Sequence, residues 1–170
     1  MSMNEQERAV FLSLLHKEVV PALGCTEPIA VALCAARAAE ELGETPEKLD
    51  VAVSANLLKN GMGVMVPGTG EMGLGVAAAA GALGGRSALG LECLKNLTEE
   101  TAEKARSMMT EEKVHLHLAY NDQLLYCLVT AFAGEKSAAA ELAGSHDNIT
   151  RVWKNGALTF EREDAASGSE

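Results

Sequence analysis

The sequence predicts an α+β fold: N-terminal helices and a β-hairpin with a Gly-rich loop come first, and an antiparallel sheet with a packed helix follows. Apolar residues recur with helical spacing early in the chain, whereas after Glu112 they alternate with polar residues, as in half-buried strands. Asn-Gly pairs, which favour two-residue hairpin turns, occur at 60–61 and 155–156. We expect one unit over residues 1–164, with sub-lobes at 1–97 and 98–164 as an option, and a flexible tail at 165–170.

Four segments have the spacing and the end signals of helices. Proline or glycine ends the first three, and Thr98 precedes the fourth as an N-cap residue, with acidic residues in the first turn. The second segment is rich in alanine, which implies close burial between neighbouring elements. The expected helices cover residues 4–19, 28–42, 76–83 and 99–109.

Strands are expected on both sides of the helical segments. The first pair is residues 49–57 and 62–66, joined at Asn60-Gly61. For residues 136–143 the preceding Gly134-Glu135 turn favours a strand, whereas composition favours a helix. The remaining expected strands are 114–118, 124–132, 149–153 and 157–161, the last two joined at Asn155-Gly156.

Composition limits the environment and the partners. The net charge is −10 and no Lys/Arg cluster is present, which argues against nucleic acid or an anionic membrane as a partner. No apolar stretch reaches membrane-spanning length, and the N-terminus has no positively charged segment of a signal peptide. The four cysteines lack CxxC spacing, so we expect a reduced, cytoplasmic protein.

Cys25 has the most informative local setting in the chain. It precedes Thr26, Glu27 and Pro28, which suit the N-cap and the first turn of a helix. Backbone N–H groups and the positive end of the helix dipole favour a thiolate there, as a metal, an iron–sulfur cluster or an electrophilic substrate requires. The alternative is a small residue packed into a tight turn.

Residues 68–73 spell GxGxxG, with Glu92 at about the distance expected for a ribose contact. A dinucleotide site requires a βαβ unit, and here the preceding strand resembles half of a hairpin. The competing interpretation is a loop at Gly68, Thr69 and Gly70 that approaches either another element or a small carboxylate, which its N–H groups would bind. Lys59 and Asn60, next to it in the expected hairpin, would add a charge and an amide, unless Lys59 is only an exposed turn residue.

Histidines occur in two settings. His115 and His117 would lie on one face of a strand, as a metal site requires, although Lys113 and the lack of a nearby third ligand favour a solvated face. His146 lies in a loop with Asn148 close by, and both are candidates for substrate contact, with His146 able to transfer a proton.

Five segments, taken in order, resemble the N-terminal part of the L-cysteine desulfidase family, which is related to the alpha chain of iron–sulfur L-serine dehydratases. The resemblance extends from about Pro21 to Phe160. The segments that carry it are ALGCTEP at 22–28, NLLKNGMGV at 56–64, VPGTG at 66–70, GALGG at 81–85 and GSHDNI at 144–149.

The resemblance implies a lyase that uses a [4Fe–4S] cluster to convert L-cysteine to pyruvate, ammonia and sulfide, or L-serine to pyruvate and ammonia. Cys25 matches the family cysteine that ligates the cluster. The family's other cluster cysteines lie in a C-terminal region that has no match here, and a cluster needs several thiolates. The cluster is therefore expected only with a C-terminal half or a separate subunit as partner, and a second copy of the chain in a homodimer is a further candidate partner.

One shared site is expected from these residues. Cys25 would be the metal ligand, Lys59 and His146 the catalytic residues, and the substrate-binding residues would be Thr26, Glu27, Asn60, Gly68, Thr69, Gly70 and Asn148. Two alternatives stay open. One is a truncated, non-catalytic homologue that acts as a binding or assembly module, and the other is a nucleotide-binding domain.

Overall fold

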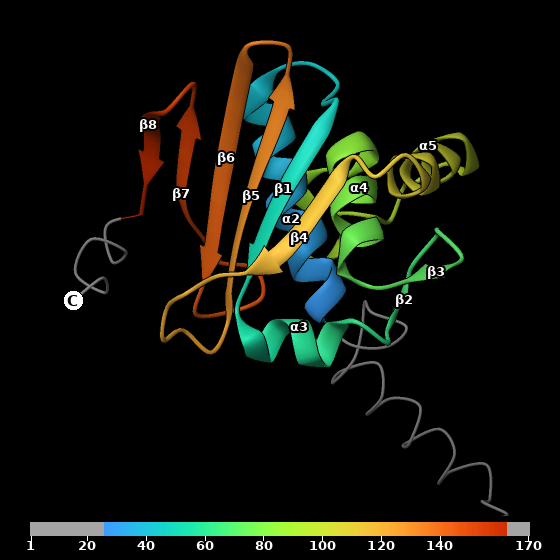
Figure 1. The fold of residues 1–170 in the computed structure, drawn as a ribbon, viewed down its shortest axis with the longest axis horizontal. Helices are drawn as coiled ribbons and strands as arrows, with labels where there is room; N and C mark the ends of the chain where they lie inside the picture. The colour runs from blue at the N-terminus through green and yellow to red at the C-terminus, as the bar shows by residue number, and fades with distance from the viewer. Residues whose placement is uncertain (1–25, 163–170) are drawn as a thin grey trace, which may run out of the picture.

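The computed structural model describes residues 26–162, which form a six-stranded mixed sheet with helices on one face (Figure 1). The strand order is β4-β1-β5-β6-β7-β8. The β1–β4 pairing is parallel and the other pairings of this sheet are antiparallel. The strands are β1 (Lys48–Val53), β4 (Val114–Leu118), β5 (Tyr126–Ala133), β6 (Lys136–Ala143), β7 (Ile149–Lys154) and β8 (Ala157–Glu161).

Helices cover one face of this sheet in two layers. Helix α2 (Glu27–Leu42) lies against β5, β6 and β7, and α4 (Leu74–Gly84) packs beside α2 near β1 and β4. Helix α5 (Glu99–Thr110) packs on the outer side of α4. Between α4 and α5 the chain forms a short 3₁₀ helix, η1 (Ser87–Glu92). The predicted α+β class is confirmed, as are the helices expected at 28–42, 76–83 and 99–109. The helix expected at 4–19 lies outside the described residues.

The α2–α4 contact depends on small side chains. Both helices are rich in alanine, and the residues of α4 from Leu74 to Ala82 are all buried. Gly81 is essential to the contact, because a Cβ there would lie only 2.7 Å from the Cα of Ala32. Two helices approach this closely only where one presents no side chain. The alanine-rich composition therefore sets how near α2 lies to its neighbour.

The hairpin expected at Asn60-Gly61 is wrong. Strand β1 ends at Val53, and residues 55–61 form helix α3 (Ala55–Gly61). The hydroxyl of Ser54 starts this helix: its Oγ accepts a hydrogen bond from the Leu57 N–H at 3.3 Å and donates one to the Leu124 carbonyl at 2.9 Å. A buried N-cap residue of this kind outweighs the local turn preference of Asn-Gly.

A smaller hairpin forms farther along the chain. Strands β2 (Met65–Val66) and β3 (Glu71–Met72) pair in an antiparallel arrangement, and the Gly68–Gly70 loop joins them. The return strand expected at 62–66 is thus reduced to two residues and pairs with β3 instead of β1. The predicted combination of a β-hairpin with a Gly-rich loop is present, but at a different position.

The strands of the second half agree with the prediction, with one change in direction. Gly134 turns β5 into β6, and Asn155-Gly156 turns β7 into β8 with positive φ at both residues. Residues 136–143 form a strand, with Ala138, Ala140 and Leu142 buried under α2. The sheet is not purely antiparallel, since α3, α4 and α5 carry the chain over one face and return β4 parallel to β1.

None of the helices within residues 26–162 is long and apolar enough to cross a membrane.

Candidate functional site

Helix α2 begins next to the loop that joins β6 and β7. Thr26 occupies the N-cap position, and its carbonyl accepts the Ala30 N–H at 2.9 Å, but its side chain makes no capping hydrogen bond. Glu27 and Pro28 form the first turn, as predicted. Cys25, the expected cluster ligand, lies outside the described residues.

Two of the predicted site residues meet at this end of α2. The Glu27 Oε2 and His146 Nε2 atoms are 3.3 Å apart, although 119 positions separate the residues in the chain. Both side chains are partly buried, with 17% of Glu27 and 33% of His146 exposed. A carboxylate that holds one imidazole nitrogen fixes the orientation of the ring. The pair is therefore suited to move a proton at a partly enclosed position.

The β6–β7 loop that carries His146 is held in shape by Asn148. The Asn148 Nδ2 donates to the Ala143 carbonyl at 2.8 Å, its backbone N–H donates to the Ser145 carbonyl at 3.2 Å, and its own carbonyl accepts the Ala143 N–H. The amide that was predicted to bind substrate is thus engaged in the loop itself. In this arrangement Asn148 positions His146.

Helix α3 brings Lys59 and Asn60 near the same end of α2. Gly61, the last residue of α3, is buried, and a Cβ there would lie 3.3 Å from the Cβ of Glu27. Lys59 lines an open hollow of about 710 Å³ between α3 and the β4–β5 loop, whereas the Asn60 side chain donates to Asn56 at 3.4 Å on the exposed side of the helix. Lys59 and Asn60 therefore lie two and one positions before Gly61, the residue of α3 that approaches Glu27. The Lys59 side chain lines a hollow that neither Glu27 nor His146 lines.

The Gly68–Gly70 loop is held by hydrogen bonds within its hairpin and to α5. The Thr69 side chain is buried: its hydroxyl donates to the Val66 carbonyl at 2.8 Å and accepts the Glu71 N–H at 3.1 Å. The Thr69 carbonyl accepts a hydrogen bond from Arg106 of α5 at 2.7 Å. Gly68 and Gly70 have positive φ, as the tight turn requires. Thr69 therefore maintains the loop and joins it to α5.

The structural context of the GxGxxG motif differs from that of a dinucleotide site. Such a site follows a strand of the main sheet and opens the helix of a βαβ unit. Here residues 68–73 begin within the β2–β3 hairpin, and the helix that follows, α4, lies in the middle of the crossover from β1 to β4.

The described cysteines do not fit an iron–sulfur cluster. Cys34, Cys93 and Cys127 are buried as free thiols, and the Cys34 thiol donates to the Ala140 carbonyl at 3.0 Å. Burial raises the pKa of Cys93 to about 12 and the pKa of Cys127 well above its usual value. Cluster ligands must be thiolates. These three residues are core residues, so any cluster requires thiolates from outside the described residues.

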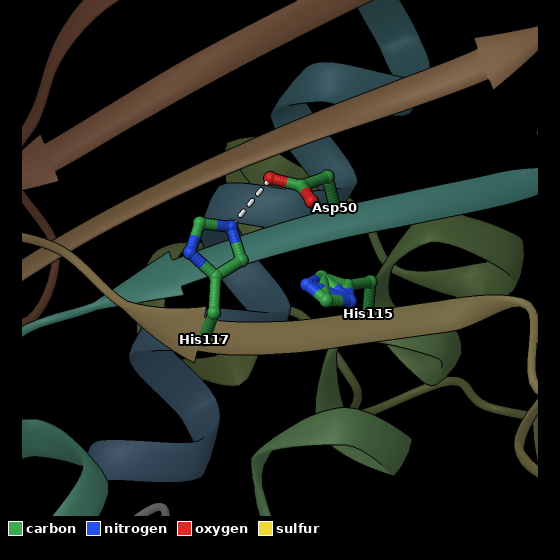
Figure 2. Close-up of side chains that lie close together, drawn as sticks. All are labelled: Asp50, His115 and His117. Atoms are coloured by element: carbon green, nitrogen blue, oxygen red, sulfur yellow. Dashed lines mark hydrogen bonds and ion pairs between the residues drawn. The ribbon is translucent and has the colours of Figure 1, made fainter.

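A second histidine–carboxylate contact, on the opposite face of the sheet from the helices, was missed in the sequence. The His117 Nε2 and Asp50 Oδ2 atoms are 2.8 Å apart, and His115 lies beside them on β4 (Figure 2). The hydrogen bond to Asp50 raises the pKa of His117. Asp50 is 65 positions before His115, and the parallel β1–β4 pairing that joins them has no local signal in the sequence.

A buried carboxylate on β6 was also missed. Glu141 accepts hydrogen bonds from the Tyr126 hydroxyl at 2.9 Å, the Thr150 hydroxyl at 2.7 Å and the Arg151 guanidinium at 2.8 Å. Burial and the adjacent carboxylate raise the pKa of Tyr126. Since its oxygens are occupied by residues of β5 and β7, Glu141 joins three strands.

Comparison with known proteins finds relatives but no matching family model. The chain is 52% identical over 158 residues to a UPF0597 protein of Oleidesulfovibrio alaskensis, and 50% identical over 155 residues to one of Chromobacterium violaceum. It is 43% identical over 169 residues to a UPF0597 protein of Bacteroides fragilis. These alignments cover 93%, 91% and 99% of the chain but only 37%, 36% and 40% of the relatives. The chain thus spans less than half the length of the relatives it matches.

Proposed function

We propose that this chain forms the cluster- and substrate-contributing part of an iron–sulfur lyase, which converts L-cysteine to pyruvate, ammonia and sulfide or L-serine to pyruvate and ammonia. The observation that carries the proposal is the Glu27–His146 contact at the start of α2. This contact joins two segments that carry the family resemblance. Glu27 belongs to the first segment, two positions after Cys25, and His146 belongs to the last segment. Relatives more than twice as long as the chain leave room for a partner region with further cysteines.

The residues of this chain supply the proton transfers of such a reaction. A neutral His146 removes the proton from the α-carbon, and Glu27 stabilises the imidazolium that forms. The electron pair of the broken C–H bond forms the double bond between the α- and β-carbons, while sulfide or hydroxide leaves the β-carbon. The resulting enamine rearranges to an imine, and water releases ammonia and pyruvate. The backbone at Thr26 remains the candidate for binding the substrate carboxylate, whereas Lys59 lines a separate hollow.

The described thiols cannot hold the cluster, because all three are buried in the core. The cluster would be held by Cys25 and by cysteines of the partner region, and it would supply a Lewis acid for the leaving group. The proposed enzyme is cytoplasmic, because its free cysteines and an oxygen-sensitive cluster both require a reducing compartment.

The test is the His146→Gln variant in the longest natural protein that contains this chain, purified without oxygen and reconstituted with iron and sulfide. Pyruvate formation from L-cysteine and L-serine is measured, and kcat is expected to fall by about 100-fold or more, as for loss of a general base. Asp147→Asn is the matched control, because this carboxylate of the same loop is exposed and accepts a hydrogen bond from the Ser145 hydroxyl at 3.4 Å. A His146→Gln protein with unchanged kcat would remove His146 from the mechanism.

Cys25→Ser tests the cluster separately from the acid–base pair. The visible absorbance of the reconstituted protein is expected to disappear in Cys25→Ser and to persist in His146→Gln. An unchanged spectrum in Cys25→Ser would exclude Cys25 as a ligand.

A further inference from the structure

Two neighbouring strands place three potential metal-binding side chains together. In the parallel β1–β4 pairing, Asp50 is the direct partner of His115, and His117 follows two residues later on β4. Side chains two positions apart on a strand point to the same face, and so do paired residues of neighbouring strands. Figure 2 shows all three side chains rising from the same side of the sheet.

This side of the sheet is away from the helices. Leu49, Val51 and Val53 of β1 are buried in the core with α2 and α4, so Asp50 between them points the other way. About 40% of the His117 side chain and 41% of the Asp50 side chain are exposed. A metal ion bound here would keep at least one position open to water.

The distances agree with a single small ion. The ligand atoms of Asp50, His115 and His117 all lie within 4.8 Å of one another. Tetrahedral Zn²⁺ with bonds of about 2.0–2.1 Å needs ligand atoms about 3.3 Å apart. The 2.8 Å between His117 Nε2 and Asp50 Oδ2 must widen slightly and the longest separation must shorten. Exposed side chains make such adjustments by small rotations.

The second nitrogen of His117 supports the same assignment. Its Nδ1 lies 3.3 Å from the Leu118 carbonyl, so a proton on Nδ1 can be donated to the backbone. That tautomer leaves the lone pair on Nε2, the nitrogen that faces Asp50. Metal-binding histidines commonly use such a backbone carbonyl to fix the ring and its tautomer.

We propose that Asp50, His115 and His117 together bind one divalent transition metal ion, either Zn²⁺ or an ion with a similar preference for nitrogen and oxygen ligands. Two imidazoles and one carboxylate select such ions over Mg²⁺ and Ca²⁺, which require mostly oxygen ligands. The net charge of −10 favours any cation. The site is separate from the Glu27–His146 pair, and it holds an ion whether or not the chain is part of a lyase.

The experiment is a titration of the purified chain with Co²⁺, followed by displacement with Zn²⁺. We expect one Co²⁺ per chain, visible bands of a four- or five-coordinate centre, and no near-ultraviolet charge-transfer band from a thiolate. His115→Gln and Asp50→Asn are each expected to lower the affinity by about 100-fold or more, since loss of even an outer contact costs about 10- to 100-fold. Both replaced side chains are exposed, and circular dichroism confirms that the variants fold.

Two controls keep the result specific. Glu111→Gln removes an exposed charge close to the start of β4 without removing a ligand, and it is expected to change the affinity less than threefold. Cys25→Ser is expected to bind Co²⁺ like the wild type. The proposal is overturned if His115→Gln and Asp50→Asn keep wild-type affinity for Co²⁺ or if Cys25→Ser loses Co²⁺ binding. It is also overturned if Co²⁺ shows only the weak spectrum of an octahedral aquo ion.

Discussion

The two histidine–carboxylate pairs of this molecule are built by different kinds of contact. His117 and Asp50 belong to adjacent strands, and the register of β1 with β4 places them together on the open face of the sheet. His146 and Glu27 belong to a loop and a helix end, and they meet only because α2 packs across β5, β6 and β7. The first pair depends on strand pairing, whereas the second depends on the position of a helix. Changes to helix packing should therefore affect the two pairs unequally.

The largest expected effect comes from Gly81→Val in α4. The new side chain would collide with the backbone of Ala32 and separate α4 from α2, so the free energy of unfolding should fall by about 3 kcal/mol. Urea denaturation measures this change. Gly63→Ala is the control, because a Cβ at Gly63 meets no atom within 4 Å, and its effect should stay within about 0.5 kcal/mol. Equal stabilities of the two variants would contradict the close α2–α4 contact.

A smaller and more selective effect is expected from Gly61→Ala at the end of α3. Its methyl group would press on the buried Leu74 and approach the Cβ of Glu27, which displaces the start of α2. The imidazole NMR signals of His146 should shift, whereas those of His117 should keep their wild-type positions. Equal shifts at both histidines would show that the two pairs are not independent.

The smallest expected effect concerns the pH dependence of the exposed pair in metal-free protein. Because the hydrogen bond to Asp50 raises the pKa of His117 above its ordinary value of 6.5, Asp50→Asn should lower it, as an NMR titration measures. The pair stabilises the folded protein below pH 6.5, and this contribution is lost as pH rises through the folded-state pKa. The contribution should be well below about 1 kcal/mol, since both side chains are solvent-exposed. An unchanged His117 pKa in Asp50→Asn would contradict the hydrogen bond.

Sequence patterns predicted the hairpins of the second half because the turns are local. Gly134 and Asn155-Gly156 need positive φ, and the residues beside them alternate in the way a half-buried strand requires. The same reasoning was wrong at Asn60-Gly61, where local preference competed with a long-range contact. Ser54 caps α3 while bonding to Leu124, seventy positions away, and no pattern near residue 60 carries that information.

The candidate sites also combine features set by neighbouring residues with contacts set by the tertiary structure. The chain itself determined that α2 would start after Cys25, that His115 and His117 would share a strand face, and that His146 would lie in a loop, because these features follow from neighbours a few residues away. Only the tertiary structure decided which carboxylate each histidine meets. Glu27 reaches His146 through helix packing, and Asp50 reaches His117 through a parallel pairing created by a helical crossover. Both contacts depend on the burial of apolar surface far from the residues that they join, which no local sequence pattern expresses.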